Sequence, residues 1–232
     1  VVAGAIYPSM TISYSTQTTK EFYNENGFAS KMCGFICSVP IIGIVVFGKD
    51  FFSLWLPTLT AQEINEVQIL SVLTLLPQMF SIYVFPLHQI NTLTCRVRIP
   101  AILDCIIGVL NIAIVYALLE FTGLGLYAIA GVSSVLLFLK TVIFVPIYAA
   151  NSIKVKKTVF YPYLIRGAVL NIAVFLICTA VHMLVSVNSW LTLVLAAAAA
   201  AAVSYGTGFF VTFTGSERGK ALTALKNKIG RI

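Results

Sequence analysis

Six long apolar runs constrain this chain more than any other feature of its sequence. Each has close to the ~20 residues that a helix needs to cross a bilayer. Barrel strands would be shorter and would alternate apolar with polar residues, which these runs do not. The sequence therefore predicts an all-α membrane protein, a polytopic bundle of six full transmembrane helices. The runs are Met32–Gly48, Val67–Leu87, Ala101–Leu119, Leu124–Ile147, Gly167–Val187 and Trp190–Phe213, and we interpret Val1–Tyr14 as the end of a seventh helix.

Composition agrees with lipid as the main solvent. The chain of 232 residues is 59% hydrophobic and 10% charged, with a mean hydropathy of +0.96. Soluble domains carry roughly 25% charged residues. The chain opens at Val1, without a Met, within an apolar stretch, so we expect it to be the C-terminal part of a longer polypeptide.

The basic residues lie between the apolar runs in a strongly one-sided way. Alternate links and the tail hold thirteen of the 15 Lys and Arg residues, whereas the opposite links hold only Lys49 and Lys140 lies inside a run. Because cytoplasmic links are enriched in Lys and Arg, this pattern predicts a multi-pass membrane protein with a cytoplasmic C-terminus. We therefore attribute the net charge of +7 to membrane orientation and not to nucleic-acid binding. Trp55 and Trp190 then belong to the outer interface.

The C-terminal tail has a pattern of its own. We divide the chain into a transmembrane bundle, 1–213, and a cytoplasmic tail, 214–232. Apolar residues recur at helical spacing after Gly219, with basic residues largely elsewhere. This pattern favours an amphipathic helix lying on the anionic inner leaflet, and a frayed polar tail is the alternative. The basic residues that would contact the lipid are Lys220, Lys226, Lys228 and Arg231.

Lys140 is the clearest candidate for a functional residue. A charge inside a membrane helix costs about 2.5–3.5 kcal/mol on insertion scales, which makes it a functional hypothesis by default. Two interpretations stay open, a cation that faces a cavity and a structural lysine that is paired or extends to the interface. Arg96, Arg98 and Arg166 are further cationic candidates for binding an anionic substrate.

Other ionisable groups are weaker candidates. Asp104 lies one turn inside its helix, where we favour pairing with the nearby loop arginines, Arg96 and Arg98. Asp104 and His182 are candidates for coupling transport to an ion, and His88 is a further possible proton carrier. The amides of Asn111, Asn171 and Gln78 are expected to hydrogen-bond across helices.

Signs of an enzyme or a metal centre are missing from the sequence. No nucleophile elbow, zinc-protease, phosphate-loop or paired-carboxylate motif is present. Cys33 and Cys37 have no His or carboxylate beside them, so we interpret the five cysteines as buried apolar residues. We expect no catalytic residue, no cofactor and no metal.

Several segments resemble a known family. They are Ala5–Thr11, the link with Lys20 and Glu21, Gly48–Leu56, Gly108–Ile112, Gly123–Ala130 and Lys140–Ala150. Their order is similar to the polysaccharide-exporter branch of the multidrug/oligosaccharidyl-lipid/polysaccharide flippase superfamily. The resemblance runs from Val1 to about Arg166.

This resemblance implies a plasma-membrane transporter of 12–14 helices in two lobes, of which this chain is the C-terminal part. The two lobes would alternate access to a cationic cavity. The cavity would receive the diphosphate–sugar head of a polyprenyl-linked oligosaccharide while the lipid tail stays in the bilayer. Two rivals remain. A multidrug-type cation antiporter shares the fold but would favour acidic groups in its cavity. A membrane enzyme of surface-sugar assembly would need a large outer loop, which the Lys49–Glu66 link is not.

Overall fold

The computed structural model describes residues 11, 14, 19–213, 215 and 218–219. This part of the chain is helical and contains no strand. Six of its helical segments are long and apolar enough to cross a membrane, which confirms the predicted fold class. The elements are α2 (Thr19–Trp55), α3 (Ala61–Leu93), α4 (Arg98–Phe121), α5 (Leu126–Leu139), a π-helical turn η1 (Lys140–Phe144), α6 (Val145–Ser152), α7 (Tyr161–Leu184) and α8 (Trp190–Thr212). Helices α5, η1 and α6 form one continuous span, 126–152.

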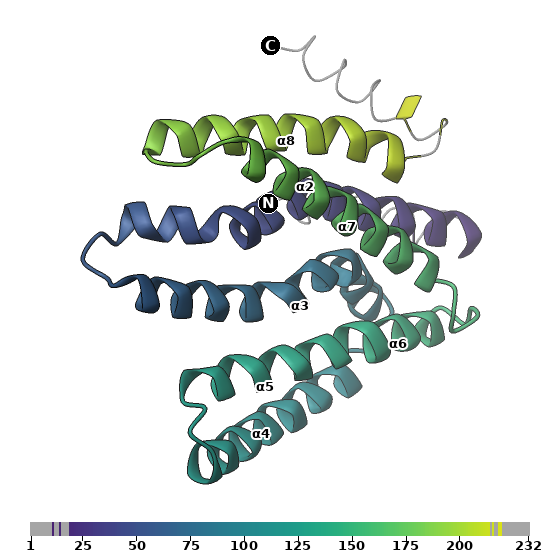
Figure 1. Ribbon diagram of the computed structural model, residues 1–232. Helices are drawn as coiled ribbons and strands as arrows, with labels where there is room; N and C mark the ends of the chain where they lie inside the picture. Colours follow the sequence, from purple (N-terminus) through teal and green to yellow (C-terminus); the bar gives the residue numbers. More distant parts are fainter. Residues whose placement is uncertain (1–10, 12–13, 15–18, 214, 216–217, 220–232) are drawn as a thin grey trace.

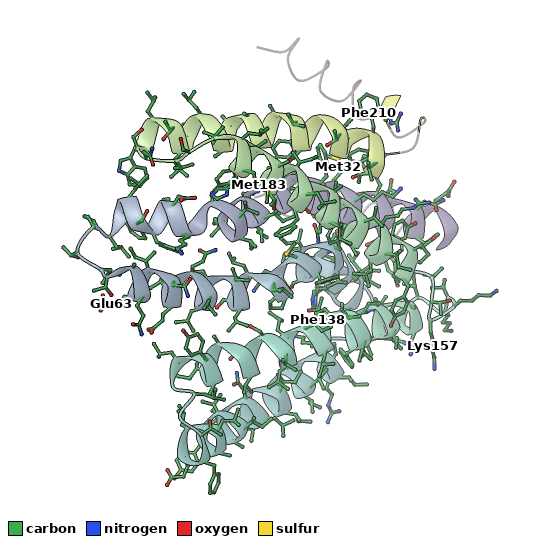
Figure 2. The ribbon with its side chains drawn as sticks, in the orientation of Figure 1. Met32, Glu63, Phe138, Lys157, Met183 and Phe210 are labelled. Atoms are coloured by element: carbon green, nitrogen blue, oxygen red, sulfur yellow. The ribbon has the colours of Figure 1, made fainter. Side chains whose placement is uncertain are left out.

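Successive spans run back and forth, so their connections gather at two opposite ends of the bundle (Figure 1). Connections 56–60, 122–125 and 185–189 lie at one end, and connections 94–97 and 153–160 lie at the other. Glu63 and Lys157, labelled in Figure 2, mark these two ends. Trp55 and Trp190 lie at the first end, where Phe51 contacts both rings with centroids 5.4 and 5.8 Å away. The predicted alternation of links is thus present in space.

Two predicted links are shorter than the sequence indicated. The charged, Gly- and Asn-bearing stretch Thr16–Ser30 predicts a polar link, but α2 covers this stretch from Thr19 onward, so the prediction is wrong for its described part. The reason is tertiary, because Phe22 is buried and Tyr23 packs on Phe160 at 5.9 Å. Lys31 is one of the thirteen Lys and Arg residues that the sequence assigns to the alternate links and the tail. It is instead buried in α2, with its ammonium 5.6 Å from the centroid of the Tyr163 ring.

The Lys49–Glu66 link shrinks to 56–60 because helices extend into it from both sides. Thr60 begins α3 with a capping box, in which its hydroxyl accepts from the Glu63 amide and Glu63 accepts from the Thr60 amide. Such a box satisfies two of the amides that a helix start leaves without partners. The sequence spacing Thr60-x-x-Glu63 carries this signal.

The packed core lies among α2, α3, α6, α7 and α8. Here the Tyr83 ring fills a space between two glycines, and a Cβ on Gly34 or Gly167 would fall 1.9 or 2.6 Å from that ring. Tyr83 itself is 3% exposed. Glycine at these two positions lets α2 and α7 approach the ring, as small residues do in membrane bundles.

Helix α4 lies at the edge of the bundle, where it packs mainly against α5 (Figure 1). None of its residues is buried. One consequence is a correction for the cysteines, since Cys105 on α4 and Cys95 in the 94–97 connection are exposed, whereas Cys33 and Cys178 are buried as expected. The predicted helix end Val1–Tyr14 and the predicted tail helix Lys220–Ile232 lie outside the described residues, apart from positions 11 and 14.

Candidate functional site

The helical geometry changes at Lys140, near the middle of its span. Residues Lys140–Phe144 form one π-helical turn, closed by a bond from the Val145 amide to the Lys140 carbonyl. Pro146 follows at once, and a proline ring clashes with the carbonyl four residues earlier in a regular helix. A wider turn before the proline relieves that clash, and single π turns are frequent at functional sites. The sequence thus places its one mid-span lysine on an irregular turn.

Lys140 forms an ion pair with Asp104 of α4. Its Nζ lies 2.5 Å from Oδ1 of Asp104, and the two side chains are 18% and 52% exposed. The expected partners of Asp104, Arg96 and Arg98, are therefore wrong, because the antiparallel packing of α4 on α5 brings Lys140 alongside. The interpretation of Lys140 as a paired lysine is confirmed. His88 of α3 is a third ionisable side chain in this region, and it interacts electrostatically with both Lys140 and Asp104.

A second polar contact joins the same two helices. The amide of Asn111 on α4 donates to the hydroxyl of Ser133 on α5 over 2.9 Å. Asn111 follows Asp104 by seven residues, and Ser133 precedes Lys140 by seven, so each pair lies on one helix face. The two contacts therefore form rungs about 10 Å apart along the helix axes. The predicted cross-helix bond of Asn111 is confirmed.

A third polar cluster lies among α2, α3 and α7, which sequence reasoning found only in part. The Ser38 hydroxyl donates to Oδ1 of Asn171 at 2.8 Å and lies 3.0 Å from the Tyr83 hydroxyl. The Asn171 amide reaches the Met79 carbonyl at 3.5 Å. The cross-helix role expected of Asn171 is confirmed. Ser38 and Tyr83 were missed because neither residue type is unusual in an apolar run.

The three candidate arginines lie away from Lys140. Arg96 is exposed in the 94–97 connection, where Nη1 donates to the Asn151 carbonyl at 3.4 Å and its own carbonyl accepts from the Tyr148 hydroxyl at 3.0 Å. Arg98 begins α4, and Arg166 is exposed near the start of α7. No described contact joins any of them to Lys140, so they mark the basic end of the bundle.

His182 belongs to a separate place. Its Nε2 lies 2.7 Å from Oδ2 of Asp50, and its ring packs edge to face on Phe47 at 5.3 Å. Asp50 is close to Trp55 along α2, so this pair lies toward the tryptophan end. The structure therefore separates the two coupling candidates, Asp104 and His182.

Comparison with known proteins gives one relative. Over its whole length the chain is 24% identical to an uncharacterized membrane protein, EpsK, of Bacillus subtilis (strain 168). The chain spans 45% of the length of that relative. No protein family matches the chain, and no solved structure does. The relative and the six apolar helices agree on a multi-span membrane protein.

Proposed function

We propose that this chain is part of a transporter that flips a polyprenyl-diphosphate-linked oligosaccharide across the plasma membrane, by alternating access, for cell-surface polysaccharide biosynthesis. The observation that carries the proposal is Lys140, a mostly buried cation on a π turn inside a membrane span. A diphosphate that leaves water needs cations and hydrogen-bond donors in place of its hydration shell. The resemblance to polysaccharide exporters points to the same substrate class.

In this proposal the Asp104 carboxylate holds Lys140 while no substrate is bound. A phosphate oxygen is an acceptor of the same kind as that carboxylate, so it can replace Asp104 at the ammonium. The Lys140 ammonium would thus keep a partner in both states, whereas Asp104, whose side chain is 52% exposed, would give up its own. The transporter moves its substrate without making or breaking a covalent bond.

The orientation is part of the same proposal. The basic end of the bundle, with the 94–97 and 153–160 connections, would face the cytoplasm. The tail residues Lys220, Lys226, Lys228 and Arg231 would contact anionic lipids of the inner leaflet. Labelling a cysteine placed beside Lys156 in intact cells tests this, since labelling by an impermeant reagent contradicts the orientation.

Transport by the full-length protein in vesicles tests the role of Lys140. We expect Lys140→Ala to lower the rate of flipping of a fluorescent polyprenyl diphosphate at least tenfold, and Lys140→Arg to retain part of it. Lys49→Ala is the matched control, because Lys49 is exposed and lies toward the opposite end of the bundle. An unchanged rate in Lys140→Ala removes Lys140 from the transport site.

One observation favours a second function, a multidrug-type cation antiporter. Asp104 is the more exposed member of its ion pair, with 52% of its side chain accessible against 18% for Lys140. An accessible carboxylate inside a span suits a cationic substrate. Export of an organic cation that is lost in Asp104→Asn, with no flipping of the diphosphate lipid by the unaltered protein, would establish this rival.

A further inference from the structure

A groove between α3 and α5 differs in its lining from the apolar cavity beside α8. The groove has a volume of about 470 Å³, and an apolar cavity beside α8 has a volume of about 420 Å³. Both are large enough for a small ligand. The α3–α5 groove carries four polar side chains, Thr74, Gln78, Ser133 and Ser134, whereas the cavity beside α8 has a mainly aliphatic and aromatic lining. In Figure 1 the two helices diverge toward the end at which α5 begins, and the groove lies in that half.

One polar side chain of the groove has a structural task. Pro77 lacks an amide hydrogen, so the carbonyl of Leu73, four residues earlier, loses its helical partner. The Ser134 hydroxyl donates to that carbonyl over 2.6 Å. Ser134 thus fixes α5 against α3, and the Phe80 ring meets Phe138, labelled in Figure 2, at 5.2 Å just beyond.

The remaining polar groups are left for a ligand. The amide of Gln78 is half-buried and has no hydrogen-bond partner among residues 19–213. Thr74 donates to its own helix at 2.8 Å and keeps its acceptor positions. Ser133 accepts from Asn111 and keeps its own hydrogen to donate. An unsatisfied amide in hydrocarbon costs several kcal/mol, so lipid is a poor occupant of this groove.

The chemistry of the lining selects an uncharged, hydroxyl-rich occupant. No charged side chain lines the groove, and Gln78, Thr74 and Ser133 together offer donors and acceptors side by side. Sugar hydroxyl groups also donate and accept, whereas a lipid tail does neither. Ser133 lies on the Lys140 face of α5, about 10 Å away, so one molecule can reach both.

We propose that this groove binds a sugar ring close to the diphosphate of the lipid-linked substrate, while Lys140 binds the diphosphate. The inference rests on the proposed function and adds a sugar subsite to it. Gln78 is its main contact, because its amide supplies two donor hydrogens and an acceptor.

Binding to the full-length protein in detergent separates the two subsites. The probes are undecaprenyl diphosphate alone and the same lipid carrying glucose, galactose or N-acetylglucosamine. We expect at least one glycosylated probe to bind five- to tenfold more tightly than the bare lipid. Gln78→Leu should abolish that difference and leave affinity for the bare lipid unchanged, whereas Lys140→Ala should weaken all probes.

Thr74→Val is a second variant that keeps the side-chain shape. Thr207→Val on α8 is its matched control, because Thr207 is also exposed and also donates to its own helix over 2.8 Å. Thr74→Val should reduce the sugar-dependent gain and Thr207→Val should not. The sugar subsite is wrong if the unaltered protein binds every probe alike, or if Gln78→Leu keeps the gain. Loss of the Lys140 effect alone contradicts the proposed function and not the subsite.

Discussion

The tight core around Tyr83 and the α4–α5 pair differ in how closely their helices pack. Around Tyr83, which is 3% exposed, helices α2, α3 and α7 meet where two glycines lie against the tyrosine ring. Helix α4 has no buried residue, and it joins α5 through one ion pair and one amide–hydroxyl bond. The Tyr83 core thus combines close packing with buried hydrogen bonds, whereas α4 has polar contacts without any buried residue.

The comparison teaches which region can change its contacts. Lipid tails are as apolar as leucine, so helices in a membrane associate through close packing and hydrogen bonds. Close packing has one solution, because a ring fitted between two glycines has no second position. A polar contact can be exchanged for a ligand group of the same chemistry. We therefore expect the Tyr83 core to serve as the scaffold and the α4–α5 pair to respond to substrate.

Gly34→Ala should have the largest effect on stability. The added Cβ would lie 1.9 Å from the Tyr83 ring, and Gly167 approaches the same edge of that ring closely as well. We expect a loss of about 3 kcal/mol, the upper end for overpacking, measured by denaturant unfolding in detergent. Gly43→Ala on the same helix is the control, since no atom lies within 4 Å of its added Cβ. Equal stability of both variants would contradict the tight core.

Asp104→Leu should cost about 2 kcal/mol, because it leaves the partly buried ammonium of Lys140 without its partner. The double variant Asp104→Leu/Lys140→Met should be more stable than the single one, since it removes both charges. Unfolding of the unaltered protein, Asp104→Leu, Lys140→Met and the double variant in the same detergent measures the coupling. Additive effects would show that the 2.5 Å contact contributes nothing to stability.

Tyr83→Phe tests the polar part of the core while it keeps the ring in place. It removes the hydroxyl that lies 3.0 Å from Ser38 and donates to the Gly167 carbonyl at 3.3 Å. We expect a loss of about 1 kcal/mol in unfolding free energy. Tyr116→Phe, at a position 70% exposed, is the matched change and should have no effect.

Asn111→Leu should have the smallest effect, about 0.6 kcal/mol, the average for a hydrogen bond between membrane helices. A double-mutant cycle with Ser133→Ala measures it, because the coupling between the two changes isolates their 2.9 Å bond. A coupling near zero would mean that α4 is held by the ion pair alone. It would then sharpen the contrast with the core around Tyr83.

The candidate site was only partly predictable. Lys140 was found because a charge inside an apolar run is conspicuous, but its partner was assigned to the wrong residues. Asp104 and Asn111 share a seven-residue spacing with Ser133 and Lys140, and this signal becomes visible once α4 and α5 are known to be neighbours. Gln78 was expected to bridge helices, yet no hydrogen bond to a described residue is formed.

The sequence by itself determined the six spans, their alternating direction and the gathering of basic residues at one end. The spans follow from the length and hydropathy of each segment against the thickness of a bilayer, and the basic end follows from where Lys and Arg lie between the segments. The tertiary structure decided the pairing of Lys140 with Asp104, the place of Tyr83 between two glycines and the helical extension from Thr19. Each depends on which helix faces meet. A helix that is apolar on all sides has no amphipathic pattern from which its packing face could be predicted.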